Sequence, residues 1–171
     1  DQPGYDRTAQ AVGIVHFGIG AFHRAHQAWY TDRAMEAGDR DWAITGVSLR
    51  SDDVARQMNP QDGLYTVTER SAAGAATRVV GAVRNVLVAG PDREAVVAAL
   101  AEPNTHIVSF TITEKGYCRA PGGGLDPAQA TKGSFYPLVA EALRRRRETG
   151  IGGLTLLSCD NLADNGQQLD G

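Results

Sequence analysis

The stretch GIVHFGIGAFHRAHQAWY, residues 13–30, decides the fold. Its first half belongs to an apolar, β-branched run over 12–17 that ends at a glycine, which is typical of a buried parallel strand. Its second half begins a pattern of apolar and small residues at helical spacing, from Phe22 to Ala37, and Gly38 follows as a helix stop. A strand, a glycine turn and a helix in direct succession predict one unit of a parallel sheet.

Extended and helical patterns alternate along the rest of the chain. The predicted strands are 42–49, 64–69, 79–89, 106–113 and 154–158, and the predicted helices follow Pro91 and span 134–149. We expect 64–69 and 79–89 to form an antiparallel pair across the turn-rich SAAGAAT segment, and 119–131 to be a surface loop. The alternation predicts an α/β fold with a doubly wound, mainly parallel sheet and helices on both faces.

The composition suits one globular domain. The chain has 171 residues, 42% hydrophobic and 22% charged, with a net charge of -3, so neither nucleic acid nor an anionic membrane is expected as a partner. The arginine run 144–147 is interpreted as a solvated helix end, and no apolar run is long enough to cross a bilayer. The first ten residues do not resemble a signal peptide. Cys118 and Cys159 match no metal-site spacing, which favours reduced thiols in a cytoplasmic protein.

Gly18-Ile19-Gly20 stands between the first strand and the first helix. In a doubly wound fold the first glycine permits the tight turn, and the second lets the backbone approach a diphosphate at the helix N-terminus. The pattern G-x-G-x-x-G is only partly met, because its sixth position is His23. A purely structural turn is the alternative interpretation.

Three polar residues follow in the predicted helix. Arg24 lies in its first turn, where a cation opposes the helix dipole, so either a bound phosphate or a nearby carboxylate should compensate it. His23 and His26 are three residues apart and could share a helix face. Because no third ligand stands at a recognisable spacing, we expect no metal site.

The second strand ends in SLRSDD, residues 48–53, where this fold places the adenosine ribose. Asp52 and Asp53 can accept hydrogen bonds from the ribose hydroxyls and would repel a 2′-phosphate, which favours NAD over NADP. Arg50 and Arg56 argue the other way, since an arginine can accommodate that phosphate. Capping of the next helix is the structural alternative for this acidic segment.

Polar residues also follow two later strands. Thr111, Thr113 and Glu114 come after the strand beginning near 106, and Asp160 and Asn161 come after the strand ending at 158. Ligands bind beyond the carboxyl ends of parallel strands, and an asparagine amide can donate to a carbonyl oxygen. Turn and cap chemistry is an equal alternative on spacing alone.

Four segments in this order resemble the mannitol dehydrogenase family: IVHFGIGAFHRAHQAWYTD, WAITGVSLR, IVSFTITEKGYC and LTLLSCDNLADNG. These long-chain polyol dehydrogenases include mannitol 2-dehydrogenase, arabinitol dehydrogenase, and the fructuronate and tagaturonate reductases. The resemblance implies a zinc-independent, NAD(P)-dependent oxidoreductase of two domains. Residues 1–171 match the N-terminal, expanded Rossmann domain, and the mostly helical catalytic domain of the family is absent from this chain.

The resemblance also implies roles for individual residues. Asn161 matches the asparagine that helps polarise the substrate oxygen at the reacting carbon, and it is the predicted catalytic residue. Together with the pattern arguments above, the predicted cofactor-binding residues are Gly18, Ile19, Gly20, Ala21, Phe22, His23, Arg24, Arg50, Asp52, Asp53, Thr111, Thr113 and Glu114.

The family's catalytic lysine belongs to a Lys-x4-Asn-x2-His signature that this chain lacks. The fifth residue after Lys115 is Ala120, and the fifth after Lys132 is Pro137. The chain stops soon after a new helix begins near Asn161, so we expect an incomplete polypeptide. Loss of a general base removes a contribution of about 10²–10⁴-fold, and these residues alone should bind NAD but turn over poorly.

Three functions follow from this sequence. The first is the NAD-binding domain of an enzyme that moves hydride between nicotinamide and C2 of a polyol, as mannitol 2-dehydrogenase does. The second is a fructuronate or tagaturonate reductase of the same family, and the third is a non-catalytic nucleotide-binding module. A small polyol or sugar acid is the expected substrate, and the sequence assigns no oligomeric state.

Overall fold

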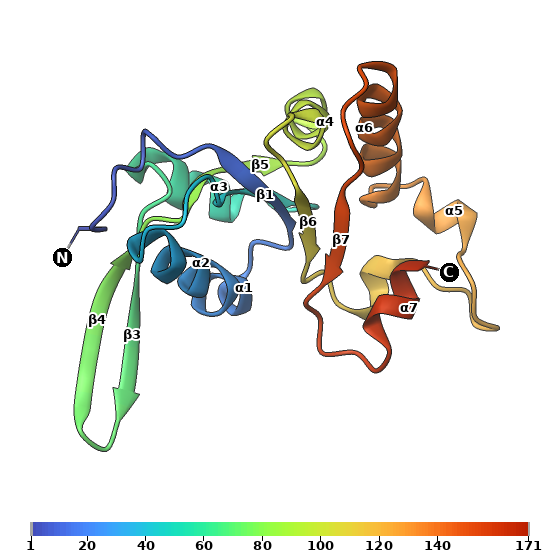
Figure 1. Cartoon of the computed structure of the whole chain (residues 1–171). Coiled ribbons are helices and arrows are strands. Elements are labelled where there is room, and N and C mark those ends of the chain that lie inside the picture. The colour runs from blue at the N-terminus through green and yellow to red at the C-terminus, as the bar shows by residue number, and fades with distance from the viewer. Residues whose placement is uncertain (1, 171) are drawn as a thin grey trace.

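The structure, a computed structural model, describes residues 2–170, so Asp1 and Gly171, the two ends of the predicted domain, lie outside the described residues. Five strands form one sheet in the order β5-β2-β1-β6-β7 (Figure 1), and every pairing in it is parallel. The strands are β1 (Val12–Phe17), β2 (Ala43–Ser48), β5 (Val83–Val88), β6 (Ile107–Phe110) and β7 (Thr155–Ser158). The predicted parallel sheet is confirmed, with the strand from the opening stretch at its centre.

Helices cover both faces of the sheet, as predicted (Figure 1). One face carries α1 (Ala21–Ala25), α2 (Gln27–Glu36) and α3 (Asp53–Met58), and the other carries α4 (Arg93–Ala101) and α6 (Tyr136–Glu148). Strand β1 supplies both cores because successive side chains of a strand point to opposite faces. Ile14 packs with α2 and α3, whereas Val15 and Phe17 pack with α4 and α6.

The helix predicted over 22–37 is two helices. His26 separates α1 from α2, with φ -122° and ψ -91°. Its amide donates to the carbonyl of His23 at 3.2 Å, which closes α1 after little more than one turn. The break turns the two histidines apart, so that His23 is buried and His26 is exposed.

The predicted pairing of 64–69 with 79–89 is correct only in part. β3 (Tyr65–Ser71) pairs with β4 (Gly74–Val80) in an antiparallel hairpin, so most of the small-residue SAAGAAT segment is strand rather than turn. The rest of the run is β5, which joins the main sheet beside β2. Small residues suit this exposed hairpin, which projects from the body of the molecule (Figure 1).

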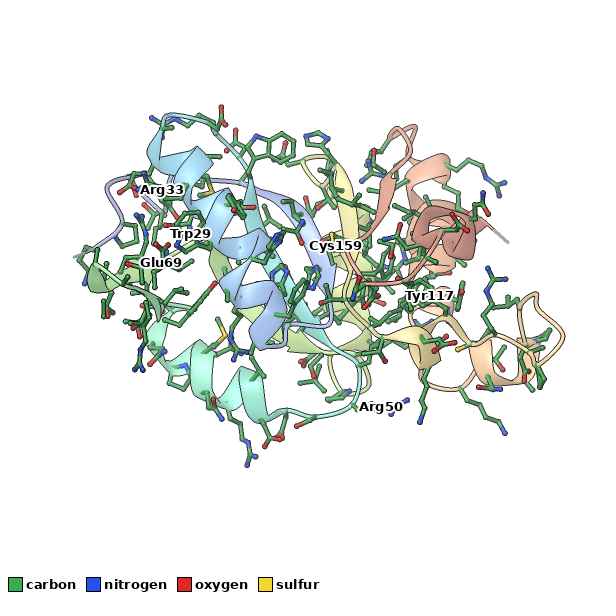
Figure 2. All side chains as sticks on the ribbon, turned by 90° about the horizontal axis from the view of Figure 1, so that it is seen from below. Trp29, Arg33, Arg50, Glu69, Tyr117 and Cys159 are labelled. Carbon is green, nitrogen blue, oxygen red and sulfur yellow. The ribbon has the colours of Figure 1, made fainter. Side chains whose placement is uncertain are left out.

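The hairpin is attached to α2 by charge. Arg78 donates to the fully buried carboxylate of Asp32 at 3.0 Å and to Glu36 at 2.9 Å. Trp29 and Arg33 of α2 and Glu69 of β3 line a cavity between the helix and the hairpin (Figure 2). Charged groups thus fix the angle at which the hairpin leaves the fold.

Short helices occupy the remaining connections. They are η1 (Asn59–Gln61), η2 (Glu114–Tyr117), α5 (Pro127–Ala130) and α7 (Asn165–Asp170). The predicted loop over 119–131 therefore holds one helical turn, and the carboxylate of Asp126 caps it by accepting the amides of Ala128 and Gln129. Within residues 2–170, none of the helices has the length and apolar character needed to cross a membrane.

Two buried histidines lie between the sheet and α1. The rings of His16 on β1 and His23 stack with centroids 3.5 Å apart and planes 15° from parallel. Nδ1 of His16 is 2.7 Å from Oγ of Ser109, and its Nε2 is 2.8 Å from Oγ1 of Thr111. Burial lowers the pKa of His16 well below its ordinary value and that of His23 to about 3, so both rings are neutral.

This pair predicts a loss of stability in mild acid. The folded-state pKa values lie below the unfolded value near 6.5, so the stabilisation is complete above about pH 6.5 and declines as the pH falls toward the folded values. Each histidine should lower the free energy of unfolding by about 1.4 kcal/mol per pH unit in that window. The measurement is urea denaturation from pH 7.5 to 4.5.

Two variants isolate the histidine contribution from that of the carboxylates. His23→Phe keeps a ring against His16 and removes one titrating group, so its stability should fall less steeply with pH than that of the parent chain. His26→Gln alters an exposed histidine of the same segment and should keep the parent slope. Equal slopes for the parent and His23→Phe would contradict this interpretation.

Candidate functional site

The carboxyl ends of the central strands meet at one edge of the sheet. Phe17 at the end of β1 lies opposite Val47 of β2 and Phe110 of β6, and Phe110 lies opposite Ser158 of β7. The segments that follow these strands therefore emerge side by side. Open parallel sheets bind their ligands at this edge, where the order of the strands reverses around the first strand.

The glycine turn after β1 is built by close backbone contact. Gly18 has φ +98°, and its amide donates to the carbonyl of Val47 at 2.9 Å. A Cβ at Gly18 would lie 2.1 Å from the carbonyl oxygen of Thr111, so no other residue fits without displacing the loop after β6. Gly20 differs, because its φ of -76° suits any residue and a Cβ there would meet only the Gly18 oxygen, at 3.8 Å. The space beside Gly20 is therefore open.

The turn offers free hydrogen-bond donors to that space. The amides of Ile19, Ala21 and Phe22 have no hydrogen-bond partner among residues 2–170. The side chain of Ile19 is buried, and a Cβ at Gly46 of β2 would come within 2.8 Å of it. Sequence reasoning missed Gly46, although a glycine inside a strand pattern signals a close approach of this kind.

Arg24 and His23, which follow the turn in α1, contact the backbone of the turn and the buried ring of His16. Nη1 of Arg24 donates to the carbonyl of Ile19 at 2.8 Å, so this cation stabilises the turn directly. His23 is buried against His16 and lines none of the cavities described below. His26 is exposed and its ring stacks on Phe22, with centroids 5.5 Å apart. Residues 2–170 contain no group of three His, Cys, Asp or Glu side chains placed to hold a metal ion.

Two cavities flank the turn, and Gly18, Gly20, Thr111 and Thr113 line both of them. The first, of about 390 Å³, is the Val54 cavity, and its further lining residues are Ile19, Ser48, Leu49, Arg50, Ser51, Val54, Ile112, Lys115 and Gly116. The second, also of about 390 Å³, is the Asn161 cavity, and its further lining residues are Ala21, Phe22, Glu114, Asp160, Asn161 and Leu162. One turn thus separates two spaces along the same edge of the sheet.

The acidic residues predicted to hold the ribose lie outside both cavities. Asp53 is 2.6 Å from Nη2 of Arg56, and Asp52 is 3.4 Å from its Nε. Both carboxylates are exposed at the start of α3, and Ser51 also donates to Asp53. Asp52 stands at the N-cap of α3 without a side-chain cap hydrogen bond, so the acidic pair is held by Arg56, and Arg50 is the charged residue of the segment that lines the Val54 cavity.

Asp160 holds the loop between the two cavities. Its carboxylate accepts the amides of Ile112 and Thr113, each at 3.0 Å, and the hydroxyl of Tyr117 at 2.7 Å. Thr113 has φ 64° and ψ 167°, a conformation that is essentially reserved for glycine and costs about 1–3 kcal/mol. Burial raises the pKa of Tyr117, which keeps its hydroxyl protonated as a donor. Sequence reasoning noted the Asp160 carboxylate but not this contact across two strand ends.

The strand order, the glycine turn and the paired cavities define a Rossmann domain that is built to bind a dinucleotide. Residues 12–171 match the model of the mannitol dehydrogenase Rossmann domain. The chain belongs to the mannitol dehydrogenase family, and the resemblance drawn from its four segments is confirmed.

Individual relatives agree with this assignment. The chain is 47% identical to mannitol 2-dehydrogenase of Pyricularia oryzae over 96% of its own length and 36% of that protein. It is 43% identical to polyol:NADP oxidoreductase of Gluconobacter oxydans, over 96% of this chain and 37% of that protein. The solved mannitol 2-dehydrogenase of Pseudomonas fluorescens, in ternary complex with NAD and D-mannitol, superposes with a TM-score of 0.87 at 37% identity, over 97% of this chain and 37% of that one. The chain therefore spans little more than a third of the length of these relatives.

The Asp160 contacts predict a specific effect of removing one charge. Asp160→Asn places an amide against backbone donors, so the free energy of unfolding should fall by about 1–3 kcal/mol. Tyr117→Phe removes one donor and leaves both backbone contacts, so it should cost about 1 kcal/mol. The measurements are urea denaturation and amide hydrogen exchange followed by NMR.

Exchange at two amides separates loop positioning from a general loss of stability. The amides of Ile112 and Thr113 should exchange faster in Asp160→Asn than in Tyr117→Phe, after correction for the stability of each variant. Identical exchange at these two amides in both variants would show that Asp160 does not hold the loop.

Proposed function

We propose that this chain is the NAD-binding domain of a polyol dehydrogenase that acts at C2 of its substrate. The arrangement of the two cavities around one glycine turn supports this most directly. A dinucleotide crosses the Gly18–Gly20 turn with its diphosphate on the free amides there, its adenosine in the Val54 cavity and its nicotinamide in the Asn161 cavity. The open space beside Gly20 fits such a diphosphate.

The cofactor is NAD in this proposal. The relative from Pseudomonas fluorescens was solved with NAD, whereas the relative from Gluconobacter oxydans is named for NADP, so the family uses both. When bound, the nicotinamide accepts or supplies the hydride of the reaction. The chain contributes the backbone amides of Ile19, Ala21 and Phe22, and Thr113 lines the cavities on both sides of the turn.

The substrate side of the proposal rests on Asn161. Its side chain lines the cavity next to Phe22 and Glu114, where an amide can donate to the oxygen at the reacting carbon and stabilise developing negative charge. Neither lysine of the chain lines this cavity in the described residues. We therefore assign the proton acceptor to the Lys-x4-Asn-x2-His signature of the family's catalytic domain, outside these 171 residues.

The substrate we propose is a polyol, with the corresponding ketose as product, as in mannitol 2-dehydrogenase. A uronate would require a cationic partner for its carboxylate, and we assign that partner, and with it the choice between polyol and uronate, to the family's catalytic domain. The two cysteines are free, which supports a cytoplasmic location for the enzyme.

The two glycines of the turn give a matched pair of tests for dinucleotide binding. Gly20→Ala should leave the free energy of unfolding within about 1 kcal/mol of the parent, because its Cβ enters open space, yet weaken NAD binding more than about tenfold. Gly18→Ala should lose both stability and binding, because its Cβ collides with the Thr111 backbone. Urea denaturation and isothermal titration calorimetry check the two effects. Undiminished NAD binding by Gly20→Ala would contradict the proposed diphosphate position.

The catalytic proposal is tested on the longer reading frame that contains this chain. With NADH, the longer protein should reduce fructose, and Asn161→Ala should lower kcat by about 10²–10³-fold while leaving NADH binding within about threefold. Fructuronate and tagaturonate serve as rival substrates in the same spectrophotometric assay. Preferred turnover of a uronate would favour the reductase alternative, and NADH binding without turnover of any of the three would favour the non-catalytic module.

A further inference from the structure

A chain of hydrogen bonds runs from the buried ring of His16 to the glycine turn. His16 on β1 lies opposite Ser109 on β6, the neighbouring strand (Figure 1), and Thr111 follows two residues later on the same side of the sheet. Nδ1 of His16 is 2.7 Å from the Ser109 hydroxyl, and its Nε2 is 2.8 Å from that of Thr111. The Thr111 hydroxyl donates to the carbonyl of Gly18 at 2.8 Å. One threonine side chain thus connects the core to the turn.

The donation by Thr111 fixes where the hydrogens of this chain lie. Burial lowers the pKa of His16 well below its ordinary value, so the neutral ring carries a single N–H. Because the Thr111 hydroxyl gives its hydrogen to Gly18, its oxygen accepts from the Nε2–H of His16. Nδ1 then accepts from the Ser109 hydroxyl, which lies nearer to Nδ1, at 2.7 Å, than to the side-chain oxygen of Gln27, at 3.0 Å. The arrangement predicts the Nε2–H tautomer of His16.

The carbonyl oxygen of Gly18 receives several contacts at once. Besides the Thr111 hydroxyl, it accepts the amide of Gly20 at 2.6 Å, and Nε2 of His16 lies 3.3 Å from it. These contacts matter because Gly18 has no Cβ to restrict rotation of the peptide that follows it. A peptide bond is planar and trans, so the Ile19 amide of the same peptide points away from the Gly18 oxygen. An oxygen held on the side of His16 therefore directs the Ile19 amide outward.

We propose that His16 and Thr111 are positioning residues for the dinucleotide, because they hold the Gly18–Ile19 peptide with its amide toward the diphosphate. This inference rests on the proposed function, which places the diphosphate on the free amides of the turn. The Ile19 amide has no hydrogen-bond partner among residues 2–170. If the peptide rotated by half a turn, the partial negative charge of the Gly18 carbonyl would face the diphosphate and repel it. His16 lines neither the Val54 cavity nor the Asn161 cavity, so it acts through Thr111.

The test compares two threonines whose hydroxyls each donate to a backbone carbonyl at 2.8 Å. Thr111→Val keeps the shape of the side chain and removes the hydroxyl, so the 171-residue chain should bind NAD about threefold to tenfold less tightly in isothermal titration calorimetry. Thr111→Ser restores a hydroxyl and should recover most of that affinity. Thr105→Val is the matched control, because Thr105 is buried and donates to Ala99 before the start of β6. It should lose stability in urea and keep its NAD affinity within about twofold.

Two NMR signals test the orientation of the peptide. At saturating NAD, the Ile19 amide proton should shift downfield in the parent chain, as an amide that donates to a phosphate does, and should shift less in Thr111→Val. The amides of Ala21 and Phe22 do not belong to the Gly18–Ile19 peptide, so their NAD-induced shifts should be the same in both proteins. The ¹⁵N spectrum of the His16 ring should show its hydrogen on Nε2.

A double variant tests whether His16 acts through Thr111. His16→Phe removes both polar contacts of the ring and should weaken NAD binding by a factor similar to that of Thr111→Val. The double variant should bind NAD within about twofold of either single variant, because residues that act through one hydrogen-bond chain are not additive. The comparison of Thr111→Val with Thr105→Val does not require His16→Phe to fold.

The outcomes separate this inference from the proposed function. A loss of NAD affinity confined to Thr111→Val, with a smaller Ile19 shift, supports the positioning role. The inference is wrong if Thr111→Val and Thr105→Val bind NAD equally well, if the Ile19 shift is unchanged in Thr111→Val, or if the His16 hydrogen lies on Nδ1. In each of these cases the parent chain still binds NAD and the proposed function stands. Failure of the parent chain to bind NAD would overturn the proposed function itself.

Discussion

The close contact between Gly18 and the backbone of Thr111 is the constraint on which the site depends. A Cβ at Gly18 would lie 2.1 Å from the Thr111 oxygen, so two chain segments that follow neighbouring strands touch with nothing between them. The contact brings the turn after β1 and the loop after β6 together as one ridge at the carboxyl edge of the sheet. Because the ridge is narrow, a cavity forms on each side of it and both cavities share its residues.

Buried polar groups fix this ridge from below and from the side. His16 contacts Thr111 and Ser109 inside the core, and Thr111 donates to the carbonyl of Gly18 at 2.8 Å. Asp160 holds the amides of the same loop from the end of β7. Buried polar groups that are hydrogen-bonded specify one arrangement, because any other would leave them unpaired. The site is therefore positioned by contacts among three strand ends.

These contacts explain which parts of the site the sequence could predict. The turn at Gly18 and Gly20, and the positions of Thr111, Thr113 and Asn161, follow from local pattern, because each comes directly after an apolar strand. The orientation of a side chain depends on the partner it finds in the fold. His23, for example, pairs with His16, and Asp53 pairs with Arg56. No spacing rule distinguishes such a partner from a ligand, so the sequence alone predicts cofactor contacts for both residues, and neither of them lines the two cavities.

The carboxyl edge of the sheet is positively charged, although the chain as a whole has a net negative charge. The chain has a net charge of -3, yet Arg50, Lys115 and Lys132 gather unpaired at the carboxyl edge of the sheet. Free amides of the glycine turn add partial positive charge at the same edge. Cavities lined by one sign of charge focus the field and raise the local concentration of an oppositely charged ligand. An acidic domain can thus attract an anionic cofactor, because these three cations at its binding edge form no ion pair with the carboxylates of residues 2–170.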